Sequence, residues 1–404
     1  MNLDNSDDFK HLLQSGRISF LIGSGLSCPY LATLGDIENR LEELEGAPEG
    51  EAKEIIRASI IKEYFEKSIG KNRNLVQIPL DAAGKKTLRD YQNFLHSVNK
   101  IILLRRSSLL SKQVNLFTTN VDIFLEKALE EQNIEFNDGF TGSLNPSFEL
   151  SNFKKSLYKT SPHYDNKSEV PIFNLFKLHG SVTWKLEKSS ESSDFAIRID
   201  NRLELLKNTE DAIVSLPEKC VISVSKEDGG NRVLKTIEEL SVEAKTLLTD
   251  SPLDDAKKTA LVKLKDSYAS IPMINPTKEK FKFTTLNYTY YELLRMFSNE
   301  LERENSILFV MGFSFADEHV REIVLRAINS NPTLLVYVFA FDNGAKEIIQ
   351  KNLGFTDKNP KNNNLRIVCN EEDSAKNTLE NINAHHFAKL ADNLFKKDEP
   401  SILT

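Results

Sequence analysis

Ile18-Ser19-Phe20-Leu21-Ile22-Gly23-Ser24-Gly25, near the start of the chain, is a short apolar run that stops at two closely spaced glycines. A run of this length, bounded by glycine, is typical of a strand that is buried on both faces of a sheet. Helical patterns separate it from later runs of the same kind, so the sequence predicts an α/β fold with a Rossmann-like, doubly wound parallel sheet. The later runs are residues 114–118, 172–178, 307–311, 334–341 and 365–369.

The composition of the chain excludes several classes of protein. It has 404 residues, 40% of them hydrophobic, and a formal net charge of −7. Enough apolar residues are present to bury a core, so intrinsic disorder of the whole chain is excluded. No apolar run approaches the roughly 18 residues of a membrane span, and the first residues carry acid where a secretory signal has an apolar segment. The mild acidity argues against a general nucleic-acid binder, so we expect any nucleic-acid contact to run through a partner.

The three cysteines, Cys28, Cys220 and Cys369, lie far apart in the sequence. Such spacing makes neither a disulfide framework nor a four-ligand zinc site, and we expect no metal. An odd number of scattered cysteines is typical of a reducing compartment, so the sequence predicts a cytoplasmic protein.

Two long, charged segments interrupt the strand pattern. Residues from about 36 to 112 and from about 185 to 280 read as mainly helical insertions, the second with a hairpin around Asp228-Gly229-Gly230. After the second insertion, Tyr288, Tyr291, Leu294, Phe297 and Leu301 recur at helical spacing and predict a helix that buries this stripe. Residues 371–404 are expected to form a C-terminal helix.

Polar residues and glycines follow each predicted strand. Ligands of doubly wound sheets bind at the carboxyl ends of the strands, so these clusters are candidate site residues. Each has a structural alternative: a glycine pair also makes a tight turn, Asn and Asp also cap helices, and a single His is often only a hydrogen-bonding partner. The clusters are Gly23-Ser24-Gly25-Leu26-Ser27, Thr118-Thr119-Asn120-Val121-Asp122, His179-Gly180, Gly312-Phe313-Ser314-Phe315-Ala316-Asp317 and Asp342-Asn343.

In this order, the first four clusters resemble the signature of the sirtuin family. That pattern is a glycine-rich loop ending in Ser, then Thr-x-Asn-x-Asp, His-Gly and Gly-x-Ser. The resemblance implies one NAD-binding domain over residues 1–404, with a core of about 1–35, 113–184 and 281–370. Although the length alone suggests two or three units at about 150 residues each, the motif order favours this single domain.

Departures from the deacylase branch of that family narrow the implied function. The four-cysteine zinc module is missing, and the early loop reads Cys28-Pro29-Tyr30-Leu31-Ala32 in place of a Pro-x-Phe-Arg element. The chain is more similar to the sirtuin-like NAD+ hydrolases of bacterial antiphage defence, which share a Gly-[Phe/Tyr]-Ser-Phe-x-Asp-x-His pattern. The segments 274–281 and 286–295 look most like the subunits paired with a HerA-type ATPase.

The resemblance implies roles for named residues. Asn120 and His179 would be catalytic, with NAD as the substrate. Residues implied to bind NAD are Gly23, Ser24, Gly25, Ser27, Asp122, Gly312, Ser314, Asp317 and Asn343. The expected partners are further copies of the chain and a HerA-type ATPase. ADP-ribosyl transfer and a non-catalytic NAD-sensing scaffold stay open as alternatives.

Overall fold

The computed structural model describes residues 6–28, 30–32, 35–105, 110–163, 165–188, 195–228, 231–273, 284–356, 360–369 and 376–398. The segment 274–281, on which part of the resemblance rests, lies outside these residues, as do positions 229 and 230 of the predicted hairpin.

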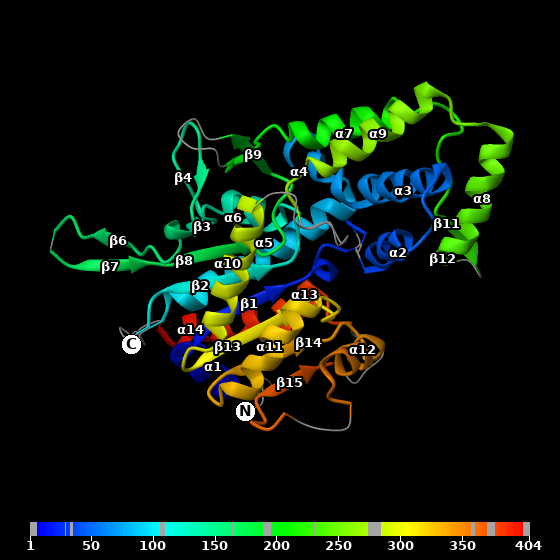
Figure 1. The fold of residues 1–404 in the computed structure, drawn as a ribbon. Coiled ribbons are helices and arrows are strands. Elements are labelled where there is room, and N and C mark those ends of the chain that lie inside the picture. The colour runs from blue at the N-terminus through cyan, green and yellow to red at the C-terminus, as the bar shows by residue number, and fades with distance from the viewer. Residues whose placement is uncertain are drawn as a thin grey trace.

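A seven-stranded parallel sheet forms the centre of the fold (Figure 1). The predicted α/β class and parallel sheet are therefore confirmed, and six of the strands match the six apolar runs. The seventh, β3, has only two residues, too few for a pattern to predict. The strands run in the order β15 (Leu365–Val368), β14 (Leu335–Phe339), β13 (Ser306–Met311), β1 (Arg17–Ile22), β2 (Gln113–Thr118), β8 (Ile172–Lys177) and β3 (Phe136–Asn137).

The strand order contains one topological switch point. From β1 the chain builds outward through β2 and β8 on one side, and then returns to build β13, β14 and β15 on the other. Residues 17–22 of β1 pair in parallel register with residues 306–311 of β13. The switch point therefore lies between β1 and β13, where the loops that leave these two strands diverge.

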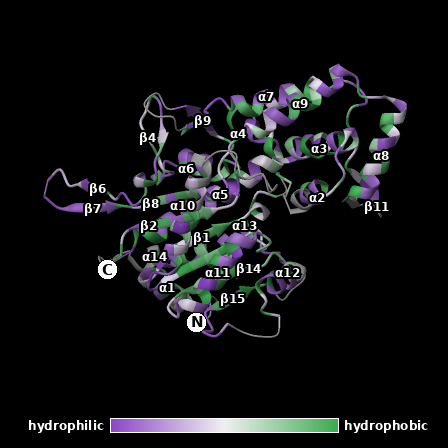
Figure 2. Ribbon diagram, in the orientation of Figure 1, coloured by the Kyte–Doolittle hydropathy of each residue, from purple (hydrophilic) through white to green (hydrophobic). Residues whose placement is uncertain are grey.

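Apolar side chains cover both faces of the sheet, as expected for continuous apolar strands; the central strands are the most uniformly hydrophobic part of Figure 2. On one face, Phe20 and Phe309 stack at 5.3 Å between ring centroids and meet Phe94 and Phe387 edge-on. On the other face, Phe117 packs against Phe297 at 4.8 Å. The helices that supply the first face are α1 (Ser6–Ser15), α5 (Ala82–Leu103), α13 (Leu379–Ile382), α14 (Lys389–Asp398) and the π-helical turn η4 (Asn383–Ala388); the second is covered by α10 (Thr284–Leu301), α11 (Glu318–Ser330) and α12 (Asn343–Leu353).

The remaining helices and small sheets lie outside this layered core. A group of helices stands beside the sheet, and the β6–β7 hairpin projects away from it (Figure 1). The hairpin predicted in the second insertion is present, as β11 paired with β12. These elements are α2 (Gly35–Glu45), α3 (Glu51–Tyr64), α4 (Asn72–Gln77), α7 (Glu204–Val214), α8 (Ile237–Asp250), α9 (Asp255–Ala269), β4 (Phe140–Thr141), β5 (Ser147–Phe148), β6 (Leu157–Thr160), β7 (Lys167–Val170), β9 (Trp184–Lys188), β10 (Phe195–Ile199), β11 (Ser225–Asp228) and β12 (Asn231–Leu234).

The apolar stripe predicted for α10 is wrong in part. Tyr288 and Tyr291 are 61% and 66% exposed, while Tyr290 and Leu293 are buried in line with Phe297. A tyrosine fits both a buried and a partly solvated position, so the spacing of the tyrosines does not show which of them face the core. The prediction therefore placed the buried stripe on the exposed side of this part of the helix. Among the helices of the described residues, none combines the length and apolar character needed to cross a lipid bilayer.

The burial of β2 makes a direct prediction about stability. Leu116 is fully buried on this central strand, whereas Leu144 is fully exposed in a loop. Replacing Leu116 by Ala leaves a cavity and is expected to lower the free energy of unfolding by about 2–5 kcal/mol. Leu144→Ala, the same chemical change, is expected to leave the urea midpoint within error. Equal midpoints for the two variants would contradict this placement of β2.

Candidate functional site

The loops after β1 and β13 meet at the switch point through their glycines. The N–H of Gly25 donates to the carbonyl of Gly312 at 3.0 Å. A Cβ on Gly23 would lie 2.3 Å from that same carbonyl oxygen, and Gly312 has a φ of +63° with Leu26 N 2.6 Å from its Cβ position. Both positions therefore exclude any side chain, and these glycines bring two backbones together.

The backbone donors of the first loop are largely occupied within the protein. Besides Gly25, the N–H groups of Gly23, Leu26 and Ser27 bond to Met311, Gly23 and Ser24 carbonyls. Ser24 is partly exposed and Gly25 is exposed. A tight turn, the structural alternative for this motif, therefore explains much of it. The part of the loop that a ligand could contact is its outer surface, at Ser24 and Gly25.

Asn120 lies in a buried polar cluster at the ends of β1 and β2. Its amide Nδ2 donates to the carbonyl of Gly23 at 3.2 Å and to Ser27 Oγ at 3.4 Å. Ser27 Oγ in turn donates to Asp122 Oδ2 at 2.8 Å. All three side chains are at most 6% exposed. The structure therefore brings Ser27 together with Asn120 and Asp122, which follow it by more than ninety positions in the sequence.

One atom of this cluster has no partner. The Oδ1 of Asn120 is buried and accepts no hydrogen bond from the described residues. Buried acceptors in native proteins are usually paired, so an orphaned one at a strand end is a position where a donor from a ligand or water fits. Because Nδ2 is held by Gly23, the direction of this acceptor is set by the protein.

Tyr91 is a member of the cluster that the sequence did not reveal. It lies on α5, is fully buried, and its hydroxyl is 3.1 Å from Ser27 Oγ. Burial, and then the charge of Asp122, raise the pKa of Tyr91 well above its ordinary value, so the hydroxyl stays protonated. Its only signal in the sequence is one aromatic residue on a helical face, which does not distinguish it from core packing.

His179 is paired with Asp317 from another loop. Its Nε2 lies 3.0 Å from Asp317 Oδ2, and the two side chains are 16% and 23% exposed. The other carboxylate oxygen of Asp317 caps α11 by accepting the N–H of Val320 at 3.0 Å. Asp317 thus occupies a fixed position, because one carboxylate oxygen caps α11 while the other contacts His179.

The loops that carry Asn120 and His179 are also joined to each other. Thr118 and Lys177 are register partners at the ends of β2 and β8, and the N–H of Val182 donates to the carbonyl of Val121 at 3.0 Å. Asn120 and His179 each follow their strand's last residue by two positions. Both therefore project from the same edge of adjacent strands.

Two further predicted site residues, Ser314 and Asn343, make contacts with the loops and helix of the other half of the sheet. Ser314 is exposed, and its carbonyl accepts the side-chain amide of Asn352. Asn343 is exposed at the start of α12, where Asp342 caps the helix and Cys369 Sγ is 3.4 Å from the Asn343 side chain. The structure thus places Ser314 beside Asn352 and Asn343 beside Cys369.

A buried ion pair stabilises the loop that carries Asp122. Lys177 Nζ is 3.0 Å from Glu126 Oε1 and also donates to the carbonyl of Asp122. Burial raises the pKa of Glu126, and the charge of Lys177 acts in the opposite direction. The pair links β8, the loop that carries Asp122 and the helix α6 (Phe124–Glu131). That helix begins at Phe124, whose N–H donates to Asp122 Oδ1 at 3.1 Å.

The arrangement combines a fixed amide acceptor, an imidazole held by a carboxylate, and two glycine loops at the switch point of the sheet. Such a set suits proton transfer and hydroxyl binding on a ligand at the carboxyl edge. Among the described residues, no three His, Cys, Asp or Glu side chains are placed to share a metal ion. No protein-family model matches the sequence, and no curated protein matches it significantly.

The Lys177–Glu126 pair predicts a pH-dependent loss of stability. Lys177→Met leaves a buried carboxylate without its partner and is expected to destabilise the fold by about 3–5 kcal/mol at slightly alkaline pH. Because the pKa of Glu126 is raised in the fold, protonation relieves the unpaired charge, and the deficit should shrink as the pH falls toward the ordinary glutamate value of 4.5. Urea midpoints at both pH values measure this.

The matched control is Lys185→Met. Lys185 pairs with Glu187 at 2.7 Å, but both side chains are more than a third exposed, so its loss should change stability by less than about 1 kcal/mol at either pH. A Lys177→Met deficit that stays constant across the pH range would contradict the assignment.

Proposed function

We propose that the chain cleaves the nicotinamide–ribose bond of NAD+, giving nicotinamide and ADP-ribose, as a sirtuin-like hydrolase without a zinc module. The observation that carries this proposal is the convergence of Asn120, with its unpaired Oδ1, and His179, held by Asp317, at one edge of the sheet. Both residues also stand at the positions that the resemblance implies for catalysis.

Asn120 would orient the attacking water or a ribose hydroxyl. Either group can donate to the unpaired Oδ1, and the hydrogen bond from Nδ2 to Gly23 keeps the amide from rotating. Positioning of this kind converts a bimolecular encounter into a reaction between fixed groups, which is a large part of catalysis. Ser27 and Asp122 then act as positioning residues, because they hold the loop in which Asn120 sits.

His179 would act as the base toward the water or the ribose hydroxyl. In the neutral imidazole, the proton on Nε2 is donated to Asp317, which leaves Nδ1 as the acceptor. Asp317 therefore selects the tautomer. We assign it this positioning role in place of the direct contact with NAD that the resemblance implies.

Cleavage of the nicotinamide–ribose bond requires few further groups from the protein. The nicotinamide ring leaves as a neutral molecule from a cationic pyridinium, so no strong general acid is required. The transition state resembles an oxocarbenium ion, as in other glycosidic cleavages. Ser24 and Gly25 on the first loop, and the surface beside Gly312, would contact the pyrophosphate at the switch point, where dinucleotides bind in doubly wound sheets.

As a biological role, we propose depletion of NAD+ in bacterial antiphage defence, in a homo-oligomer that works with a HerA-type ATPase. This rests on the resemblance, and the ATPase is the expected trigger. An assay of the purified chain alone and with that partner separates intrinsic from partner-dependent turnover. ADP-ribose that stays bound to a macromolecule would instead indicate a transferase, and NAD binding without turnover a scaffold.

The first functional prediction concerns the two catalytic residues. Asn120→Ala and His179→Ala are each expected to lower the rate of nicotinamide release from NAD+ by about 10²–10⁴-fold, because each removes a group positioned at the reacting bond. His163→Ala, on the exposed β6–β7 loop, is the control and should retain parental activity. Variants of Asn120 and His179 that cleave NAD+ at the parental rate would refute the proposal.

A second prediction separates the positioning role of Asp317 from helix capping. Asp317→Asn keeps an oxygen that can cap α11, but it removes the charge that holds His179, and we expect kcat to fall by about 10²-fold with little change in melting temperature. Asp342→Asn makes the same change at the cap of α12, where Asp342 accepts the N–H of Ala345 at 2.9 Å. It should leave kcat unchanged. Equal kcat values in both variants would remove Asp317 from the mechanism.

A further inference from the structure

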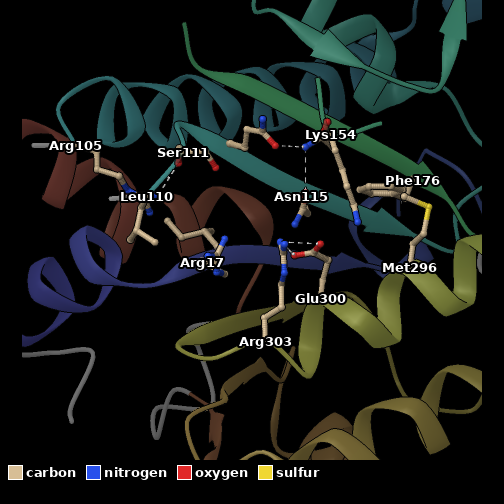
Figure 3. A pocket seen from close by; sticks show the side chains of 13 residues that line it. Arg17, Arg105, Leu110, Ser111, Asn115, Lys154, Phe176, Met296, Glu300 and Arg303 are labelled. Carbon is tan, nitrogen blue, oxygen red and sulfur yellow. Dashed lines mark hydrogen bonds and ion pairs between the residues drawn. The ribbon is translucent and has the colours of Figure 1, made fainter. Parts of the chain in front are cut away.

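A pocket lies at the opposite, amino edge of the sheet, remote from the cluster around Asn120. It has a volume of about 50 Å³ and sits between the first residues of β1 and β2 and the last turns of α10 (Figure 3). Arg17 is the first residue of β1 and Gln113 the first of β2. The pocket therefore opens at the amino ends of β1 and β2, and Phe176 of β8 also lines it.

The charge of the pocket is strongly basic. Four of the side chains that line it are cationic, namely Arg17, Arg105, Lys154 and Arg303, and only Glu300 is acidic. In Figure 3, Lys154 and Arg303 reach in from opposite sides, and Arg17 lies between Arg105 and Glu300. A small pocket with this balance favours an anion.

Two of these cations already bond to other groups of the protein. Arg303 Nη1 pairs with both carboxylate oxygens of Glu300 at 3.1 Å. The Arg105 guanidinium donates to the carbonyls of Leu13 and Gly16 at 2.8 and 2.9 Å. Burial lowers the pKa of Arg105 to about 10, which leaves it charged at neutral pH.

The other two cations are available. Neither the Arg17 nor the Lys154 side chain has a hydrogen bond or ion pair to any residue in the described ranges, although both line the pocket. The Nε of Arg105, a residue only 5% exposed, is also without an acceptor there. Cations that share one pocket repel one another, and an anion between them removes that repulsion.

A row of polar side chains crosses the sheet at the same level. Ser19, Asn115 and Asn174 are register partners on β1, β2 and β8. Asn115 Nδ2 lies 3.4 Å from Ser19 Oγ, and Asn174 Nδ2 donates to Asn115 Oδ1 at 3.2 Å. Farther along the strands this face is apolar, so burial of this row costs free energy at every polar atom that lacks a hydrogen-bond partner.

The row leaves one acceptor unused. Asn174 also donates Nδ2 to Gln113 Oε1 at 3.3 Å, so both of its amide hydrogens face acceptors. Its Oδ1 therefore points away from them and has no partner among the described residues, although Asn174 is only 2% exposed. The pocket thus combines unused cations with one unused, buried acceptor.

We propose that this pocket is a binding site for a phosphate group, separate from the proposed NAD site, with Arg17 and Lys154 on the phosphate oxygens and Asn174 Oδ1 accepting a P–OH hydrogen. The size agrees. One water needs about 10–15 Å³ of such volume, so about 50 Å³ corresponds to a few waters or one tetrahedral oxyanion. A protonated oxyanion satisfies the cations and the acceptor at once.

The test is calorimetric titration of the full-length protein with inorganic phosphate at constant ionic strength and neutral pH. Saturable binding is expected, and Arg17→Gln and Lys154→Gln should each weaken it by about tenfold, the effect of one charge-assisted hydrogen bond. Lys155→Gln is the matched control, because Lys155 is the neighbouring residue, does not line the pocket and is bonded to Asn152 Oδ1. It should bind phosphate as the parent does.

Several outcomes would overturn the proposal. One is that the parent protein binds no phosphate. Another is that Lys154→Gln and Lys155→Gln bind phosphate with equal dissociation constants. Lys154 is exposed, so its variant folds even if Arg17→Gln does not. Sulfate carries no proton at neutral pH, so affinity equal to that of phosphate would overturn the role of Asn174. Self-association lost in Lys154→Gln without any phosphate binding would assign the pocket to a protein contact.

A parallel titration with AMP distinguishes the two sources of a phosphate group. Binding of both ligands, weakened in the same variants, indicates that a nucleotide phosphate reaches the pocket. Binding of inorganic phosphate alone indicates a site closed to esters. Either result supports a phosphate site, and because no NAD turnover is measured, both stand independently of the proposed hydrolase activity.

Discussion

The close approach of the backbones at Gly23 and Gly312 is the constraint on which the candidate site depends. The two loops touch through the hydrogen bond from Gly25 to Gly312, and no side chain fits between them. This contact joins the halves of the sheet where the strand order reverses. It also places the carbonyl of Gly23 where it holds the Asn120 amide. The polar cluster at the ends of β1 and β2 therefore depends on two residues that have no side chain.

The polar groups at this edge are held by a second layer that comes from elsewhere in the chain. Tyr91 from α5 supports Ser27, and the Lys177–Glu126 pair anchors the loop of Asp122. Buried polar networks of this kind are stable only when nearly every member has a partner. The unpaired Oδ1 of Asn120 is an exception within such a network, which is why we read it as functional.

The helix α10 connects the two edges of the sheet. Near its start, the buried Tyr290 hydroxyl lies 2.7 Å from the position of a Cβ on Gly180, beside His179. Near its end, Met296 and Glu300 line the basic pocket, together with Arg303 just beyond the helix. The packing of Phe297 on Phe117 holds the helix against β2. The candidate site and the basic pocket are thus parts of one continuous packed layer.

The sequence alone determined the α/β class, six of the seven parallel strands and the strand-end positions of Asn120 and His179, because buried strands and the loops after them leave local patterns. It did not predict Tyr91 in the cluster, the Asp317–His179 pair or the exposed side of α10, because each depends on which distant elements touch. Burial, partners and unpaired atoms are properties of the packed chain. Only the tertiary structure therefore decided which polar residues form a site, and that Arg17, Lys154 and Asn174 share a pocket.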